Sequence, residues 1–125
     1  RAVDDAIRRC GGAAATSGKV MAELSLGFWR QLTTASHEKT IWVPYVHHAY
    51  PRGTDRALVN DAIGNILTVR NRIAHHEPIF DRGKPAEEPA AVQADLMRVM
   101  AMIAPDAAAH LGPSSTVAAV LLRRP

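Results

Sequence analysis

The sequence has one cysteine and few aromatic residues. Cys10 is the only cysteine among 125 residues, so no disulfide can form within the chain, and this predicts a cytoplasmic protein stabilised by packing alone. Aromatic residues make up 5% of the chain, and much of its hydrophobic fraction of 47% is alanine. Because Ala and Leu favour helices whereas strands favour branched and aromatic residues, this composition predicts an all-α fold.

The sequence also lacks the patterns typical of membrane spans, metal centres and cofactor sites. Its apolar run at residues 117–122 is much shorter than the ~18 residues that a membrane helix needs, so we expect no membrane partner. No H-E-x-x-H spacing, paired cysteines or glycine-rich phosphate loop is visible, so we expect neither a metal nor a cofactor. His47 and His48 are accordingly expected to be ordinary, partly exposed histidines.

Apolar periodicity and capping residues predict one domain over residues 1–125, a bundle of about five or six helices. The expected helices are residues 2–10, a helix from a cap at Thr16 or Ser17 to Thr33, one from a cap at Thr54 or Asp55 to Ala74, then 89–103, 105–110 and a last one from a cap at Ser114 or Ser115 to Leu122. A further helix starting at Pro44, or an edge strand, is expected within residues 41–51. Loops are expected at 34–39, 51–54 and 81–85, with Glu87 and Glu88 in a solvated loop. Since the chain begins at Arg1 without Met, we expect the C-terminal fragment of a longer protein.

The predicted helix that ends at Ala74 carries an arginine in the middle of its apolar face. At ~100° per residue, Arg70 falls in line with Ile66 and Ile73. A guanidinium is costly to bury without partners, by several kcal/mol. Arg70 therefore has a buried acidic partner, or points into a cleft, or lies where the apolar face becomes an interface.

The opposite side of the same helix is polar but almost uncharged. Asn60, Gly64, Thr68, Asn71 and His75 line up along it, and we call these five residues the polar strip. A glycine in a helix interior costs roughly 1 kcal/mol relative to Ala. Small polar residues around a glycine permit the close approach of a second helix or of a ligand, and simple solvent exposure is the alternative.

Arginine and histidine side chains gather at the end of this helix, in residues 70–76. An imidazole titrates near neutral pH and can take a proton from a ribose 2′-hydroxyl, while a guanidinium stabilises the negative charge that develops on phosphate. The net charge of +3 is compatible with a polyanionic partner and equally with a solvated basic surface. The cluster thus permits RNA cleavage without a metal.

Residues 70–75, Arg-Asn-Arg-Ile-Ala-His, resemble the R-N-x-x-x-H form of the motif of HEPN domains, and residues 70–79 resemble the Abi-like, abortive-infection branch of that family. The resemblance implies an all-α HEPN fold, a homodimer, and a metal-independent endoribonuclease in phage defence or a toxin–antitoxin system. Its partners would be RNA and an antitoxin protein. It assigns catalysis to Arg70, His75 and Asn71, and a supporting role in RNA binding to Arg72, His76 and Glu77.

The spacing of the motif raises a geometrical difficulty. Arg70 and His75 are five residues apart, about 140° around an ideal helix, so they cannot share one face. Either the helix ends before His75, or Arg70 reaches round, or motifs from two subunits combine. The alternative function is a catalytically inactive HEPN-like module that binds RNA or a protein.

Overall fold

The computed structural model describes residues 1–80 and 83–123, and every regular element in these ranges is helical. Its α-helices are α1 (Ala2–Arg9), α2 (Ser17–Glu23), α3 (Leu26–Gln31), α4 (Arg56–Ala74), α5 (Pro89–Ile103), α6 (Pro105–Leu111) and α7 (Val117–Leu121). The connections contain the 3₁₀ turns η1 (Gly12–Ala14), η2 (Ala35–His37), η4 (Val46–Ala49), η5 (Pro85–Glu87) and η6 (Gly112–Ser114), and the π-helical turn η3 (Glu38–Trp42). The all-α prediction is confirmed. The predicted loop at 81–85 falls partly on Asp81 and Arg82, which lie outside the described residues.

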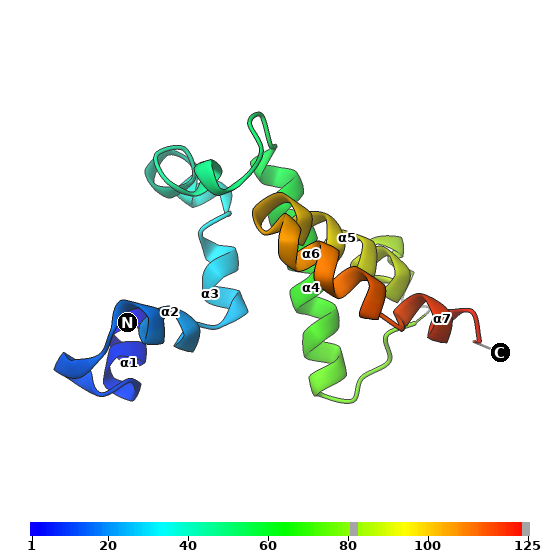
Figure 1. Ribbon diagram of the computed structural model, residues 1–125, viewed down its shortest axis with the longest axis horizontal. Helices are drawn as coiled ribbons and strands as arrows, with labels where there is room; N and C mark the ends of the chain where they lie inside the picture. Colours follow the sequence, from blue (N-terminus) through cyan, green and yellow to red (C-terminus); the bar gives the residue numbers. More distant parts are fainter. Residues whose placement is uncertain (81–82, 124–125) are drawn as a thin grey trace.

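Helices α4 and α5 pack against each other at the centre of the molecule, and α6 packs on α5 (Figure 1). The buried residues of these three helices are Val59, Ala62 and Val69 of α4, Val92 and Val99 of α5, and Ala108 of α6. On α4 the spacing 59–62–69 follows one side of a helix, as the apolar periodicity predicts. Ile73 was expected on the same side but is 58% exposed, so the apolar face of α4 extends beyond the core.

Helices α1 and α2 lie beside each other and apart from the α4–α7 body, to which α3 leads (Figure 1). An ion pair between Arg9 and Glu23 joins the two helices. Ala6 is the buried apolar residue of α1. The N-terminal helices therefore contribute little to the packing of α4 and α5.

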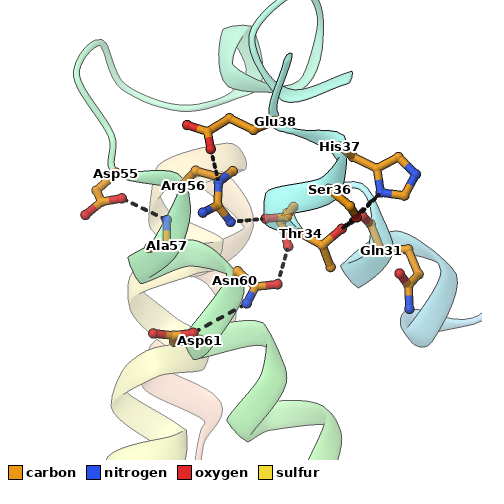
Figure 2. Close-up of polar contacts among 11 residues, drawn as sticks. Gln31, Thr34, Ser36, His37, Glu38, Asp55, Arg56, Ala57, Asn60 and Asp61 are labelled. Atoms are coloured by element: carbon orange, nitrogen blue, oxygen red, sulfur yellow. Dashed lines mark hydrogen bonds and ion pairs between the residues drawn. The ribbon is translucent and has the colours of Figure 1, made fainter. Parts of the chain in front are cut away.

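The start of α4 is fixed by a cap and by an arginine. The Asp55 carboxylate accepts a hydrogen bond from the backbone N–H of Ala57 at 2.8 Å, which identifies Asp55 as the N-cap (Figure 2). Arg56 donates to the carbonyl of Thr33 at 2.8 Å and pairs with Glu38 at 3.3 Å, as Figure 2 shows in part. These contacts attach the segment after α3 to the first turn of α4.

The single helix predicted from Thr16 or Ser17 to Thr33 is wrong, because the chain breaks between α2 and α3. The hydroxyl of Ser25 accepts a hydrogen bond from the N–H of Phe28 at 3.2 Å and so begins a new helix. Serine competes with the helical backbone in this way, and it is for this reason a better cap than an interior residue. The predicted cap at Thr16 is observed, accepting from the N–H of Lys19.

Three further expectations need correction. Residues 35–39 lie in the helical turns η2 and η3 instead of a loop, and the hydroxyl of Thr34, before η2, is bonded to the ring of His37. Neither a helix from Pro44 nor an edge strand is present, and residues 46–49 form a 3₁₀ turn. The last helix has Thr116 as its N-cap and not Ser114 or Ser115, and the hydroxyl of Ser115 accepts from the side-chain amide of Gln93.

Replacing Asp55 with alanine should destabilise the protein by about 1 kcal/mol, because the first turn of α4 loses its capping acceptor. Thermal unfolding followed by circular dichroism would measure this as a lowering of Tm by several degrees. Thr54→Ala is the matched control, since the Thr54 hydroxyl donates to the carbonyl of Pro51 and caps no helix. Equal loss in the two variants would contradict the assignment of the cap.

Candidate functional site

Helix α4 ends at Ala74, and the chain then leaves the helix through a Schellman turn. The N–H of Glu77 donates to the carbonyl of Arg72 at 2.9 Å, and the N–H of His76 donates to that of Ile73 at 3.2 Å. His76 adopts a left-handed conformation, with φ of 57°, at the position where helices usually place glycine. His75 is the C-cap, with φ of −98° and ψ of 9°. The helix therefore ends before His75, which is one of the three arrangements that the motif spacing allowed.

The imidazoles at this turn are exposed to solvent. His75, His76 and Glu77 are all exposed, and within the described part of the chain their side chains form no hydrogen bond or ion pair. Backbone groups alone satisfy the end of the helix. The side chains of the turn are thus left available to a ligand or to a second subunit.

Arg70 is exposed on the last turns of α4, and its Nη1 donates to the side-chain carbonyl of Asn71 at 3.1 Å. Among residues 1–80 and 83–123, no carboxylate pairs with it. A buried acidic partner, one of the three explanations for its place on the apolar face, is therefore not found there. The structure brings the side chains of Arg70 and Asn71 together. His75 is joined to Asn71 through the backbone alone, its N–H donating to the Asn71 carbonyl at 3.0 Å, and no described side-chain interaction joins it to Arg70.

Arg70 borders an apolar groove of about 580 Å³ between α4, α5 and α7. Its floor includes Ile66, Ile73, Val92 and Leu96. A second apolar groove of about 540 Å³ shares Ile66 and Leu96 with the first and continues toward α3, where Trp29 is 38% exposed. From here on, the apolar face means the surface formed by these two grooves together, which is wider than the apolar side of α4 alone. Exposed apolar surface that adjoins charged and polar residues in this way is a candidate site of interaction.

Arg72 forms an ion pair with Glu87 at 2.7 Å, and both side chains are about one-eighth exposed, at 13% and 12%. Lys84 contacts the same carboxylate at 3.3 Å. The solvated loop expected at Glu87 is therefore wrong for this residue, which ties η5 to the end of α4. The guanidinium of Arg72 is engaged within the chain, so its predicted role in RNA binding stays a prediction.

Partial burial alone would raise the pKa of the Glu87 carboxyl. The hydrogen bonds and charges of Lys84 and Arg72 outweigh that effect, so the pKa of Glu87 lies below its ordinary value of 4.5. The carboxylate is therefore charged at neutral pH, as the ion pair requires.

The polar strip of α4 is covered at its N-terminal end. Asn60 accepts from the hydroxyl of Thr33 at 3.2 Å, and Thr33 is 2% exposed. Arg30, on α3, lies directly over Gly64. Simple solvent exposure, the alternative explanation of the polar strip, is therefore wrong for its N-terminal half, where a second helix approaches closely. Nothing in the sequence pattern marks Arg30, but the mid-helix glycine Gly64 was a signal that another segment packs there.

The remaining histidines contribute no metal centre in the part of the chain that the structure describes, where no group of three or more His, Cys, Asp or Glu side chains could hold an ion. His47 faces the carbonyl of Trp42 through Nδ1 at 3.1 Å, and its ring lies 3.9 Å from that of His48.

Comparison with protein-family models, curated proteins and solved structures finds no match to this chain. Among the described residues, the helices are all too short or too polar to span a bilayer.

The left-handed conformation of His76 makes a testable demand on the residue at that position. A β-branched side chain is strained there, by about 1–2 kcal/mol, whereas glycine is not. His76→Val should therefore lower the free energy of unfolding by about 1–2 kcal/mol relative to His76→Gly, as measured by chemical denaturation. Equal stability of the two variants would show that the turn is not formed.

The Glu87 ion pair should make stability depend on acid pH. Because the folded pKa of Glu87 is lowered, its contribution is complete above about pH 4.5 and is lost as pH falls through the folded pKa. The stability difference between wild type and Glu87→Gln should therefore shrink as pH is lowered from neutrality. Glu77→Gln, which removes an exposed carboxylate, is the control and should show no such trend. A pH-independent difference for Glu87→Gln would contradict the ion pair.

Proposed function

We propose that this protein is a metal-independent endoribonuclease in which Arg70, Asn71 and His75 act at a cleft between two copies of the chain. The observation that carries the proposal is the state of Arg70. It is an exposed guanidinium without a described acidic partner, bonded to Asn71, beside a large apolar groove. The similarity of residues 70–75 to the R-N-x-x-x-H motif supports the same assignment.

The chemistry needs only the groups that the motif provides. The imidazole of His75 takes the proton from a ribose 2′-hydroxyl as the 2′-oxygen forms a bond to the adjacent phosphorus. The guanidinium of Arg70 stabilises the negative charge on the pentacoordinate phosphorus centre. The bond from phosphorus to the 5′-oxygen then breaks, and that oxygen takes a proton from an imidazolium. The products are a 2′,3′-cyclic phosphate and a free 5′-hydroxyl.

Two features support a second copy of the chain as part of the site. No described interaction within one chain brings His75 to Arg70, so a site made within one subunit has no observed means of holding both groups. The apolar face next to Arg70 is also uncovered, and Ile73 and Val120 beside it are 58% and 62% exposed. A stable protein interface removes about 800 Å² from solvent on each partner. A dimer through the apolar face would bury this surface and place Arg70 beside the partner.

The cellular role that follows is the arrest of translation or phage growth by RNA cleavage, with a protein antitoxin as the natural restraint. An exposed basic motif of this kind can be blocked by an acidic protein surface.

RNA cleavage measured in EDTA tests the proposal. Arg70→Ala and His75→Ala should each lower the rate at least a hundredfold, because general base catalysis and charge stabilisation contribute about 10²–10⁴ each. Arg52→Ala and His110→Ala remove an exposed residue of the same type elsewhere and should retain activity. RNA carrying a 2′-O-methyl group at the cleaved nucleotide should not be cleaved by the wild type or by any variant.

Cleavage that survives both motif substitutions would overturn the site assignment. Intact RNA binding without cleavage by the wild type would favour the inactive binding module instead. Analytical ultracentrifugation of the same preparation should show a dimer, and a monomer at high concentration would contradict the shared cleft.

A further inference from the structure

A polar cavity of about 460 Å³ lies on the side of α4 opposite the apolar groove. Arg30 from α3 covers it, and its other polar lining residues are Asp61, Asn65, Thr68 and Asn71 of α4. Because Asn71 also accepts the hydrogen bond from Arg70, the cavity is continuous with the motif. The polar strip and the predicted catalytic residues therefore meet at Asn71.

The guanidinium of Arg30 has no ion-pair partner among the described residues. Four buried side-chain atoms lack a hydrogen-bond partner in the described structure: Nε of Arg30, Nε of Arg56, Nη1 of Arg72 and Oε2 of Glu87. Three of the four belong to ion pairs, those of Arg56 with Glu38 and of Arg72 with Glu87. Arg30 Nε is the exception, with no carboxylate partner among residues 1–80 and 83–123. Arg30 also lines the cavity, so its guanidinium is the cationic donor that an anionic ligand there would meet.

Gly64 creates the position that Arg30 occupies. A Cβ atom added at Gly64 would lie 3.2 Å from both Nε and Nη2 of Arg30, closer than ordinary van der Waals contact. The glycine therefore lets the guanidinium lie flat on the helix backbone. Thr68 leaves the space open, because its hydroxyl donates to the carbonyl of Gly64 at 2.9 Å. The cost of a mid-helix glycine, roughly 1 kcal/mol, is thus explained by the placement of a cation.

The remaining groups indicate which ligand fits. The planar guanidinium offers paired donors that match the geometry of phosphate oxygens. Asp61 at the rim opposes a small, highly charged anion, but its carboxylate can accept from a hydroxyl, and the amides of Asn65 and Asn71 can donate or accept. A phosphodiester carries one negative charge, and its ribose supplies a 2′-hydroxyl donor. A ribonucleotide unit therefore satisfies the cavity better than a free anion or a peptide carboxylate.

We propose that this cavity binds a backbone phosphate of the RNA strand, with Arg30 as its anchoring residue and Gly64 as the residue that seats it. The inference rests on the proposed ribonuclease function, since it assigns part of that substrate's path. RNA lying along α4 would contact Arg70 on one turn and Arg30 about two turns away. Arg30 is a binding residue here, remote from the bond that is cleaved.

Equilibrium binding of a fluorescently labelled single-stranded RNA oligonucleotide, followed by anisotropy over a range of KCl concentrations, tests this site. The measurements are made in a His75→Ala background so that the RNA stays intact. Arg30→Gln should weaken binding about tenfold at low salt and reduce the salt slope by about one, as expected for one lost phosphate contact. Gly64→Ala keeps every charge and shifts the guanidinium by only a few tenths of an ångström, so it should weaken binding less than Arg30→Gln does.

Arg52→Gln is the matched control, because it removes an exposed arginine from the turn before α4. It should change affinity less than twofold, and circular dichroism should show equal helix content in all variants. Unchanged affinity and slope in Arg30→Gln, or equal losses in Arg30→Gln and Arg52→Gln, would overturn the site. So would the absence of RNA binding in the His75→Ala protein.

The two proposals fail in different measurements. If RNA binding depends on Arg30 but the wild-type protein does not cleave RNA in EDTA, the phosphate site is supported and the ribonuclease function is rejected. If cleavage depends on Arg70 and His75 but RNA binding is unchanged in Arg30→Gln, the ribonuclease function is supported and the phosphate site is rejected.

Discussion

Arginine contacts at the two ends of α4 are the constraint on which the rest of the structure depends. At the first turn, Arg56 attaches the helix to Thr33 and Glu38, and at the last turn Arg72 attaches it to Glu87. Breaking one partner of such a half-buried pair leaves an uncompensated charge, so these contacts are costly to lose. They hold α4 in a fixed position between the segment after α3 and the start of α5. The two surfaces of α4 are consequently presented in a defined orientation.

Those two surfaces have different chemical characters, and the motif lies across their boundary. Arg70 borders the apolar groove while Asn71 lines the polar cavity, and one hydrogen bond connects them. A ligand that contacts both Arg70 and Asn71 must therefore carry negative charge and also form hydrogen bonds. The apolar groove, in contrast, suits an apolar protein surface. The proposed function would use the apolar groove for association and the polar cavity for nucleic acid, on different sides of a single helix.

The sequence was sufficient to predict what depends on local chemistry. The all-α class, the bounds of α5 and the end of α4 at Ala74 follow from composition, Pro89, Pro78 and apolar spacing. The break at Ser25 was missed because the apolar spacing of Val20, Leu24 and Phe28 continues across the serine. Burial of Glu87 and the placement of Arg30 over Gly64 depend on contacts between distant segments, which periodicity does not encode. Arg70 and Asn71 were predicted to lie on different sides of the helix, so their hydrogen bond could be found only from the structure, as could the left-handed turn at His76.

The separation of α1 and α2 from the α4–α7 body has a consequence for the distribution of stability along the chain. Segments with few buried apolar contacts open at lower free energy than the core of the same protein. The N-terminal helices should therefore exchange their amide hydrogens through local opening, while those of α4 and α5 exchange through global unfolding. Helix α3 leads from one region to the other and carries Arg30. The N-terminal limit of the more stable region therefore falls at the helix that completes the polar cavity.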